Sequence, residues 1–295
     1  MRLLVQDGRP TATIVVPAEP GDGERRAARE LQTYIKKASK AELPVRTVGK
    51  AVDGTSIVLG AACRGLKHPA VGDGFTIEID AESIKIAGGN QRGTLYGVYT
   101  FLENQLGIRW YMPEEIGEVV PRSRTIRVAP VDRQEHPDFE YRWIGRGNEW
   151  SARNRNNVGL PEIGVNVFRS AHTFRTFLDP RKYFAEHPEW FALVDGERRM
   201  FKSTTHRNQI CTGNPRAIEE VIKNMRAFVD ENPETHVITL FPNDGMGFCE
   251  CHACKELDEP EWATVEEVNR HGRAAGLRGY GTLSRRMMIF NNAVA

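Results

Sequence analysis

The sequence predicts an α/β protein in which a small mixed α/β domain precedes a second domain built on parallel strands. In residues 1–130, short apolar strands alternate with amphipathic helices. Farther along, residues 237–241 (VITLF) form a continuous apolar run, as expected of a strand buried on both faces, and they follow an amphipathic helix. Strand, helix and buried strand in this order indicate a right-handed parallel βαβ unit.

The composition is that of an ordinary globular chain, with 295 residues, 40% hydrophobic and 27% charged. Forty basic and 39 acidic side chains leave a net charge of +1, which argues against a nucleic-acid surface or a polybasic membrane patch. No run reaches the ~18 apolar residues of a membrane-spanning helix. Residues 1–8 lack the apolar core of a secretory signal. We therefore expect no nucleic-acid or membrane partner. The location is cytoplasmic by default, or secreted or periplasmic if a leader is missing.

The first predicted domain, residues 1–130, has strands at 13–16 and 57–60 and an antiparallel pair at 75–79 and 83–86. Two helices accompany these strands. The first is capped by Asp22 and carries a buried stripe; the second ends at Gly107, a residue typical of the position after a helix. No phosphate loop or dinucleotide fingerprint occurs in this domain.

A polar, proline-marked stretch at residues 130–137 predicts the boundary, so the second domain is expected at residues 137–295. Asn214 followed by Pro215 predicts a helix start, with the cap residue preceding proline at the first helical position. The predicted strands are residues 141–145, 209–211 and 237–241, and a final amphipathic helix starts at Leu283.

If residues 137–295 form a parallel barrel, the loops that follow its strands converge at one rim. Polar and aromatic side chains beside carboxylates suit a polyhydroxylated ligand, which needs hydroxyl contacts and an aromatic face. Asp244 is the first candidate for a catalytic carboxyl, and Glu149 is the second. The candidates for substrate binding are Arg142, Arg146, Asn148, Trp150, His172 and Asn243.

Each of these residues also has a simpler interpretation. Asp244 precedes a glycine and can be a turn former. Glu149 can be a solvent-facing residue in a first helical turn, and His172 can be a buried histidine bonded to a backbone carbonyl.

Cys249, Cys251 and Cys254 form a C-x-C-x-x-C cluster directly after the Asp244 loop. Three thiolates can bind a structural zinc ion, with His252, Cys211 or a distant residue as the fourth ligand. A disulfide or buried free thiols are the alternatives. We expect no required cofactor, and a structural zinc as the possible metal.

Several motifs also resemble known families. LP at 43–44, RGTLYGVY at 92–99 and GIRWY at 107–111 resemble the N-terminal domain that precedes the barrel in α-glucuronidases and β-hexosaminidases. The motifs YFAEHPEWFAL at 183–193, QICTGNP at 209–215 and NDGMGFCECHAC at 243–254 resemble the bacterial domain of unknown function 4838. That family is placed among barrel-type glycoside hydrolases, so the resemblance implies a (β/α)8 TIM-type barrel that acts on carbohydrate.

The resemblance also implies residue roles. Arg142 is similar to the arginine that grips the sugar at the end of the first barrel strand in family 20 hexosaminidases. Those enzymes place a glutamate acid directly after an aspartate, whereas here Gly245 follows Asp244. Substrate-assisted cleavage of N-acetylhexosamines is therefore not expected.

Three functions follow from these patterns. The first is hydrolysis of a glycosidic bond, which commonly needs two carboxyls, the second of which can lie beyond residue 295. The second is a non-catalytic carbohydrate-binding protein with a degenerate glycosidase site. The third is a redox or metal protein built around the cysteines.

The sequence further predicts that this chain is incomplete, because a (β/α)8 barrel takes ~250 residues and only about 160 follow the boundary. We expect this chain to express poorly or to lack glycosidase activity, and an extended version to be soluble.

Overall fold

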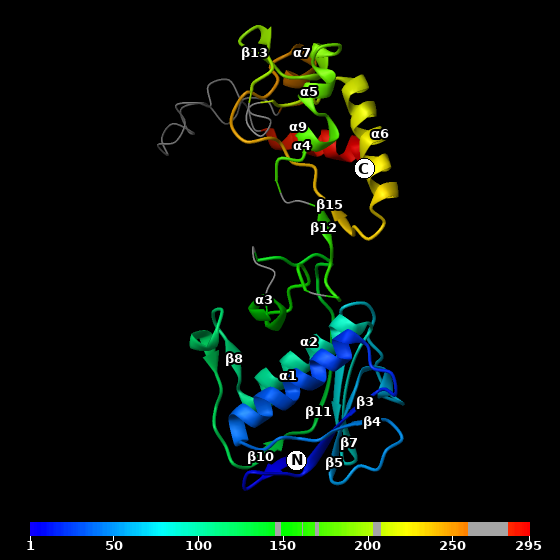
Figure 1. Ribbon diagram of the computed structural model, residues 1–295, viewed down its shortest axis with the longest axis vertical. Coiled ribbons are helices and arrows are strands. Elements are labelled where there is room, and N and C mark those ends of the chain that lie inside the picture. The colour runs from blue at the N-terminus through cyan, green and yellow to red at the C-terminus, as the bar shows by residue number, and fades with distance from the viewer. Residues whose placement is uncertain (145–148, 161, 169–170, 203–207, 259–282) are drawn as a thin grey trace. The chain divides into compact units, whose positions relative to one another are not determined.

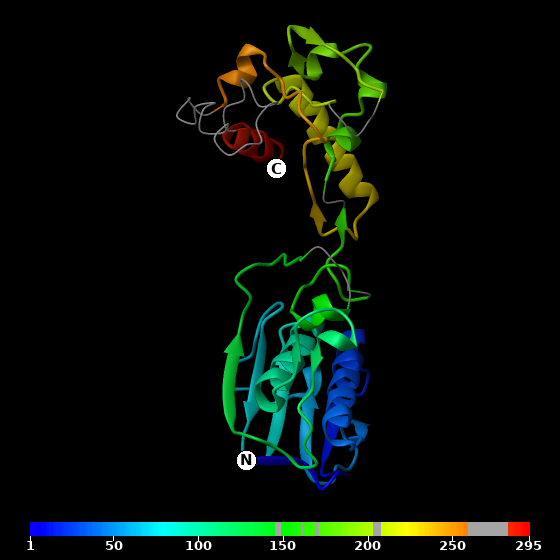
Figure 2. The same cartoon turned by 90° about the vertical axis from the view of Figure 1, so that its left-hand side faces the viewer.

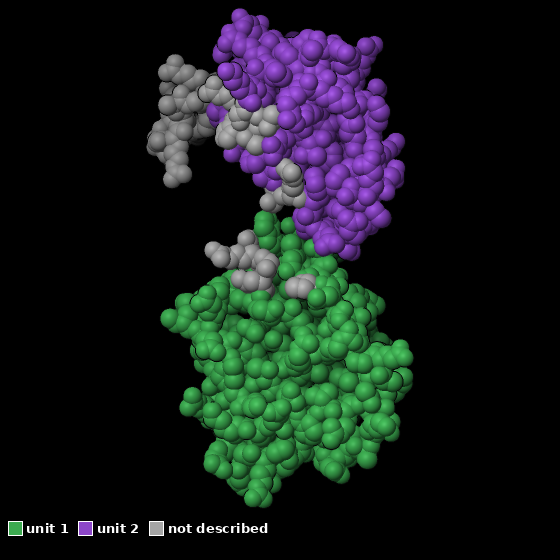
Figure 3. Space-filling view, viewed as in Figure 1, with its two compact units in different colours: residues 1–165 green, residues 166–295 purple. Residues whose placement is uncertain are grey.

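The computed structural model describes residues 1–144, 149–160, 162–168, 171–202, 208–258 and 283–295. The chain divides into two compact units, Met1–Val165 and Asn166–Ala295, which are coloured separately in Figure 3. Each unit has its own hydrophobic core. Among the described residues, no helix is both long and apolar enough to cross a membrane.

The first unit is built on a mixed six-stranded sheet with the strand order β11-β6-β7-β5-β3-β4. The pairs β4–β3, β3–β5 and β5–β7 are parallel, whereas β7–β6 and β6–β11 are antiparallel. The antiparallel pairing of β6 with β7 confirms the pair predicted at residues 75–79 and 83–86. The strands are β3 (Ala12–Val16), β4 (Val45–Thr47), β5 (Thr55–Leu59), β6 (Phe75–Ile79), β7 (Ser83–Gly88) and β11 (Val131–Glu135).

Helices α1 (Asp22–Ser39) and α2 (Gln91–Leu106) lie side by side on one face of this sheet (Figures 1 and 2). The predicted stripe of α1 is buried, and α2 ends at Gly107, whose φ of 72° is left-handed as predicted. The cap of α1 differs from the prediction. Gly21 is the cap residue, and its backbone N–H donates to the Glu24 carboxylate at 2.9 Å.

Smaller elements complete the first unit. A three-stranded antiparallel sheet has the order β10-β1-β2, and β8 pairs antiparallel with β9. Short 3₁₀ helices occur at Gly60–Ala62 and Glu115–Gly117. The bounds of the other elements are β1 (Arg2–Gln6), β2 (Arg9–Pro10), β8 (Arg109–Trp110), β9 (Glu118–Val119), β10 (Ile126–Val128) and α3 (Glu149–Arg153).

The division between the units falls at Val165 and Asn166, not in the proline-marked stretch at residues 130–137. Strand β11 occupies that stretch and pairs with β6 over its whole length. Pro130 and Pro137 lie outside the strand ends, where their missing N–H groups remove no ladder hydrogen bond. Prolines that suggest a linker therefore flank an edge strand.

The segment after β11 is held to the first unit by the carboxylate of Asp73. Oδ1 accepts hydrogen bonds from Asn90 and from Arg92, each at 2.8 Å, and Oδ2 accepts from Arg142 at 2.6 Å and from Asn157 at 3.1 Å. The Asp73 side chain is 8% exposed. Burial raises the pKa of this carboxyl, but the hydrogen bonds from Asn90 and Arg142 and the charge of Arg92 hold it below its ordinary value.

The second unit contains a parallel pair, β12 (Val167–Phe168) and β15 (Val237–Ile238), and a hairpin, β13–β14. Phe174, Phe177, Phe191, Val221 and Phe290 are buried in its core. Asn214 caps α6 and Pro215 is its first residue, as predicted. The remaining elements are β13 (Leu193–Val194), β14 (Glu197–Arg198), α4 (Phe174–Phe177), α5 (Pro180–Tyr183), α6 (Pro215–Glu231), α7 (His252–Lys255), α9 (Leu283–Val294) and a 3₁₀ helix at Pro188–Trp190.

Two predicted strands of the second domain are not strands. Residues 141–144 pair with no sheet, and Gly145 lies outside the described residues. Within residues 209–211, Ile210 makes a single antiparallel bridge to Phe191, because the neighbouring main-chain groups bond to Trp190 and Ala192. The parallel partner of β15 is therefore β12. Among the described residues of the second unit, β12 and β15 form one parallel strand pair, not a complete barrel.

The Asp73 network leads to a prediction about stability. Replacing Asp73 by Asn should lower the free energy of unfolding at pH 7 by about 3 kcal/mol, because it leaves two partly buried arginines without their carboxylate. Since the folded pKa of Asp73 is depressed, its contribution is present above the unfolded value of about 3.9 and is lost as pH falls through the folded value. Chemical denaturation at pH 7 and pH 3 should show the difference between wild type and variant shrinking at pH 3.

The matched control is Asp132→Asn, which removes an exposed carboxylate 3.2 Å from Lys67. It should cost about 0.5 kcal/mol or less. Equal losses in the two variants would contradict a special role for Asp73.

Candidate functional site

The side chains of His172 and Asp244 face each other on the loops that follow the parallel strands β12 and β15. His172 Nε2 lies 3.6 Å from Asp244 Oδ2. The two side chains are 32% and 57% exposed, so a ligand can reach the pair from solvent. In parallel sheets the loops at the carboxyl ends of neighbouring strands carry ligand sites, and this pair occupies such a position.

The two loops are tied together by reciprocal hydrogen bonds. The backbone N–H of Phe241 donates to the hydroxyl of Thr173 at 2.7 Å, and the N–H of Phe174 donates to the carbonyl of Phe241 at 3.0 Å. Thr173 is fully buried. These bonds satisfy the main chain beyond the strands and fix the distance between the residues that carry the imidazole and the carboxylate.

Asn243 holds the loop in place from the other side. Its backbone N–H donates to Oε1 of Gln209 at 3.1 Å, and its carbonyl accepts from Nε2 of Gln209 at 2.6 Å. The Asn243 amide donates to the carbonyl of Asn208 at 2.5 Å. Asn243 is 3% exposed, and its Oδ1 has no partner among the described residues. This predicted substrate-binding residue is therefore buried and positions Asp244.

His172 has an unusual backbone conformation. Its φ of 57° is in the left-handed region, which few residues other than glycine adopt. Its Nδ1 is buried and has no hydrogen-bond partner among the described residues. The surrounding hydrogen bonds must maintain this strained conformation, which is common at functional sites. The ring is thus fixed with Nε2 toward Asp244, and an imidazole beside a carboxylate can exchange protons with a bound ligand.

Three other predicted site residues belong to the first unit, where the described contacts give them packing roles. The guanidinium of Arg142 binds Asp73 and donates to the carbonyls of Arg155 and Phe139 at 2.8 and 2.6 Å. Glu149 pairs with Arg26 at 2.5 Å. The indole N–H of Trp150 donates to the carbonyl of Trp110 at 3.0 Å, and its ring packs against the first core. Arg146 and Asn148 lie outside the described residues.

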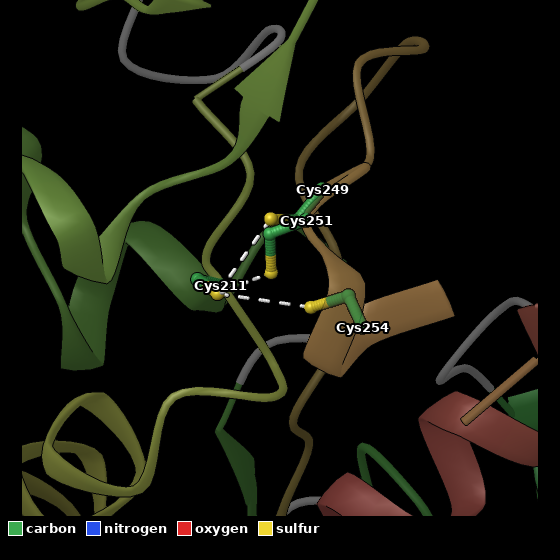
Figure 4. A group of neighbouring side chains, drawn as sticks. All are labelled: Cys211, Cys249, Cys251 and Cys254. Carbon is green, nitrogen blue, oxygen red and sulfur yellow. Dashed lines mark hydrogen bonds between the residues drawn. The ribbon is translucent and has the colours of Figure 1, made fainter. Parts of the chain in front are cut away.

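Four cysteines form a second cluster in the second unit (Figure 4). The predicted trio, Cys249, Cys251 and Cys254, converges with Cys211, which precedes α6. All four sulfur atoms lie within 4.8 Å of one another. His252, another predicted fourth ligand, points its ring at Glu256 at 3.4 Å, and its side chain is 88% exposed. The structure therefore brings Cys211, and not His252, next to the three other cysteines.

Sequence reasoning missed the residues that hold these sites together. The sequence pattern places Gln209 in a strand and gives Thr173 and Asp73 no role. Their signals are weak, because a buried glutamine, threonine or aspartate has no periodic pattern, and their partners lie far away in the sequence.

Comparisons with known proteins identify a family. The model described as "Domain of unknown function (DUF4838)" matches residues 112–295, which confirms the family indicated by the motifs. No curated protein matches the chain.

Three solved structures show weak likeness. A chitobiase from Flavobacterium johnsoniae is 12% identical over 99% of this chain and 48% of its own, with a TM-score of 0.42. A family GH115 4-O-methyl-α-glucuronidase with specificity for decorated arabinogalactans is 14% identical over 82% and 26%, with a TM-score of 0.39. A GH20 β-N-acetylhexosaminidase from Streptomyces coelicolor A3(2) is 18% identical over 48% and 25%, with a TM-score of 0.32. The chain spans between a quarter and a half of these proteins.

The Gln209 contacts lead to a second prediction. Gln209→Ala should destabilise the second unit by about 1–3 kcal/mol, because it leaves the buried N–H and carbonyl of Asn243 without partners. Hydrogen exchange at residues 243–245 should become faster. The control Gln6→Ala, on an exposed position of β1, should change neither quantity. Unchanged exchange in Gln209→Ala would show that the loop does not depend on this side chain.

Proposed function

Because this chain belongs to the DUF4838 family, whose description states no activity, we propose its function from the geometry of its second unit. The proposal is hydrolysis of a glycosidic bond in a glycan, with Asp244 as one of the two carboxyls that such hydrolysis commonly uses. The observation that carries it is the pairing of Asp244 with His172 at the carboxyl ends of two parallel strands.

The position of Asp244 suits this chemistry. Its side chain is 57% exposed, although the preceding Asn243 is almost fully buried. A carboxylate that is reachable, yet attached to a rigid main chain, can be held at hydrogen-bond distance from a substrate oxygen. His172 would orient this carboxylate and hold or accept a proton at Nε2.

The substrate class follows from the sequence. The motifs that surround Asp244 resemble a family placed among barrel-type glycoside hydrolases, and amide and imidazole groups suit sugar hydroxyls. In this proposal β12 and β15 are two strands of a (β/α)8 barrel, and the loops after them form part of its catalytic rim.

Of the two candidates for a catalytic carboxyl, the proposal keeps Asp244 alone. Glu149 belongs to the first unit and is paired with Arg26, so the proposal assigns it no catalytic step. His172 and Asn243 are retained as substrate-binding residues, and Arg146 and Asn148 remain candidates. Arg142 and Trp150 already make the packing contacts described above, and the proposal does not depend on them.

The test is release of reducing sugar by the full-length protein from a panel of aryl glycosides and polysaccharides. Asp244→Asn should lower the rate on any cleaved substrate by about 10²- to 10⁴-fold, the usual contribution of a general acid or base. His172→Asn should also lower it, and asparagine tolerates the left-handed backbone of that position.

The matched control is Glu234→Gln, which removes an exposed carboxylate ahead of β15, at the opposite end of that strand. It should leave the rate unchanged. Full activity in Asp244→Asn would exclude the catalytic role. Glycan binding by wild type and Asp244→Asn alike, with no hydrolysis, would favour the carbohydrate-binding function instead.

A further inference from the structure

The four-cysteine cluster has the dimensions of a metal site. Cys211 Sγ lies 3.6 Å from the sulfur atoms of Cys249 and Cys251 and 3.7 Å from that of Cys254. Four thiolates around a tetrahedral zinc ion, each at about 2.3 Å, have sulfur atoms about 3.8 Å apart. The observed separations are close to this value, and the cysteines are free thiols.

From this geometry we propose that Cys211, Cys249, Cys251 and Cys254 bind one structural zinc ion. All four ligand positions come from the protein, and Cys211, Cys249 and Cys254 are buried. A closed set of four thiolates leaves no position for a substrate or water, which is the arrangement of structural and not catalytic zinc sites.

The surroundings of the sulfur atoms fit bound thiolates. The backbone N–H of Leu193 donates to Cys249 Sγ at 3.3 Å, and the N–H of Gly213 donates to Cys254 Sγ at 3.2 Å. The Arg198 side chain lines the same pocket as Cys211 and Cys251. Amide donors and a nearby guanidinium offset the negative charge that four thiolates and one Zn²⁺ carry together.

Zinc binds thiolates and not thiols, so its binding would release the protons of the cysteines and become tighter as pH rises.

The backbone is shaped for this convergence. A Cβ on Gly213 would lie 2.9 Å from the carbonyl carbon of Ala253 and 3.0 Å from the nitrogen of Cys254. Glycine is thus required for the loop that carries Cys211 to approach the turn that carries the other three cysteines.

Zinc would join the two segments that also meet through Gln209 and Asn243. Cys211 lies two residues after Gln209, and Cys249 lies five residues after Asp244. Arg286, buried in α9, adds a further connection, because it pairs with Asp258 and donates to the carbonyl of Cys249 at 2.8 Å. The ion would therefore stabilise the loop of Asp244 without taking part in its chemistry.

The test measures metal in the purified chain, a readout that does not depend on glycosidase activity. We expect one zinc ion per chain, released protons on binding, and the visible spectrum of a tetrahedral tetrathiolate after replacement by Co²⁺. The zinc content of the Cys211→Ser and Cys254→Ser variants should in each case be well below one ion per chain. Cys63→Ser, which changes the buried cysteine of the first unit, should keep the full equivalent.

Wild-type protein provides a test that does not depend on variant folding. Removing zinc with a chelator should lower the melting temperature and speed hydrogen exchange at residues 208–213 and 243–254, with no change in β3 or β5. Full zinc content in Cys211→Ser, disulfides among the four cysteines, or free titration of all four thiols with no metal bound would overturn the proposal. Bound zinc whose removal leaves exchange unchanged would overturn its structural role.

Discussion

The position of Asp244 depends on one buried side-chain amide. Gln209 is 1% exposed, and its amide accepts from the N–H of Asn243 and donates to its carbonyl, as a neighbouring strand would. A loop beyond a two-residue strand has few main-chain partners of its own. A buried peptide group without a partner costs about 1–3 kcal/mol, so the amide selects one loop conformation. The exposed carboxylate of Asp244, the reciprocal bonds to Thr173 and the cysteine cluster all lie on segments that this contact holds in register.

In the first unit, a charged side chain holds irregular chain segments in place. Asp73 accepts four hydrogen bonds from side chains at the start of α2 and in the irregular segments before and after α3. A buried carboxylate is stable only when its partners offset its desolvation, and here two guanidinium groups and two amides do so. In both units, therefore, a buried polar side chain attaches irregular chain to regular structure, and the residues first considered for sugar binding partly serve this purpose.

Most elements whose signals are local were predicted correctly from the sequence, although the cap of α1 was not. The stripe of α1, the Gly107 end of α2, the Asn214–Pro215 start of α6 and the β6–β7 pair depend on residues within a few positions of each other. The prediction was wrong where a partner decides the outcome. Residues 131–135 form an edge strand because they pair with β6. Within residues 209–211, Ile210 forms a bridge with Phe191, and β15 pairs with β12 instead.

The sequence by itself determined the α/β character of the chain, its family, and the C-x-C-x-x-C turn with Cys211 among the candidates for a fourth neighbour. Only the tertiary structure decided that Cys211 joins that turn while His252 faces Glu256, that His172 meets Asp244, and that Arg142 binds Asp73. The physical reason is distance along the chain. Periodicity and capping act over one or two turns, whereas these contacts join segments that are brought together by packing.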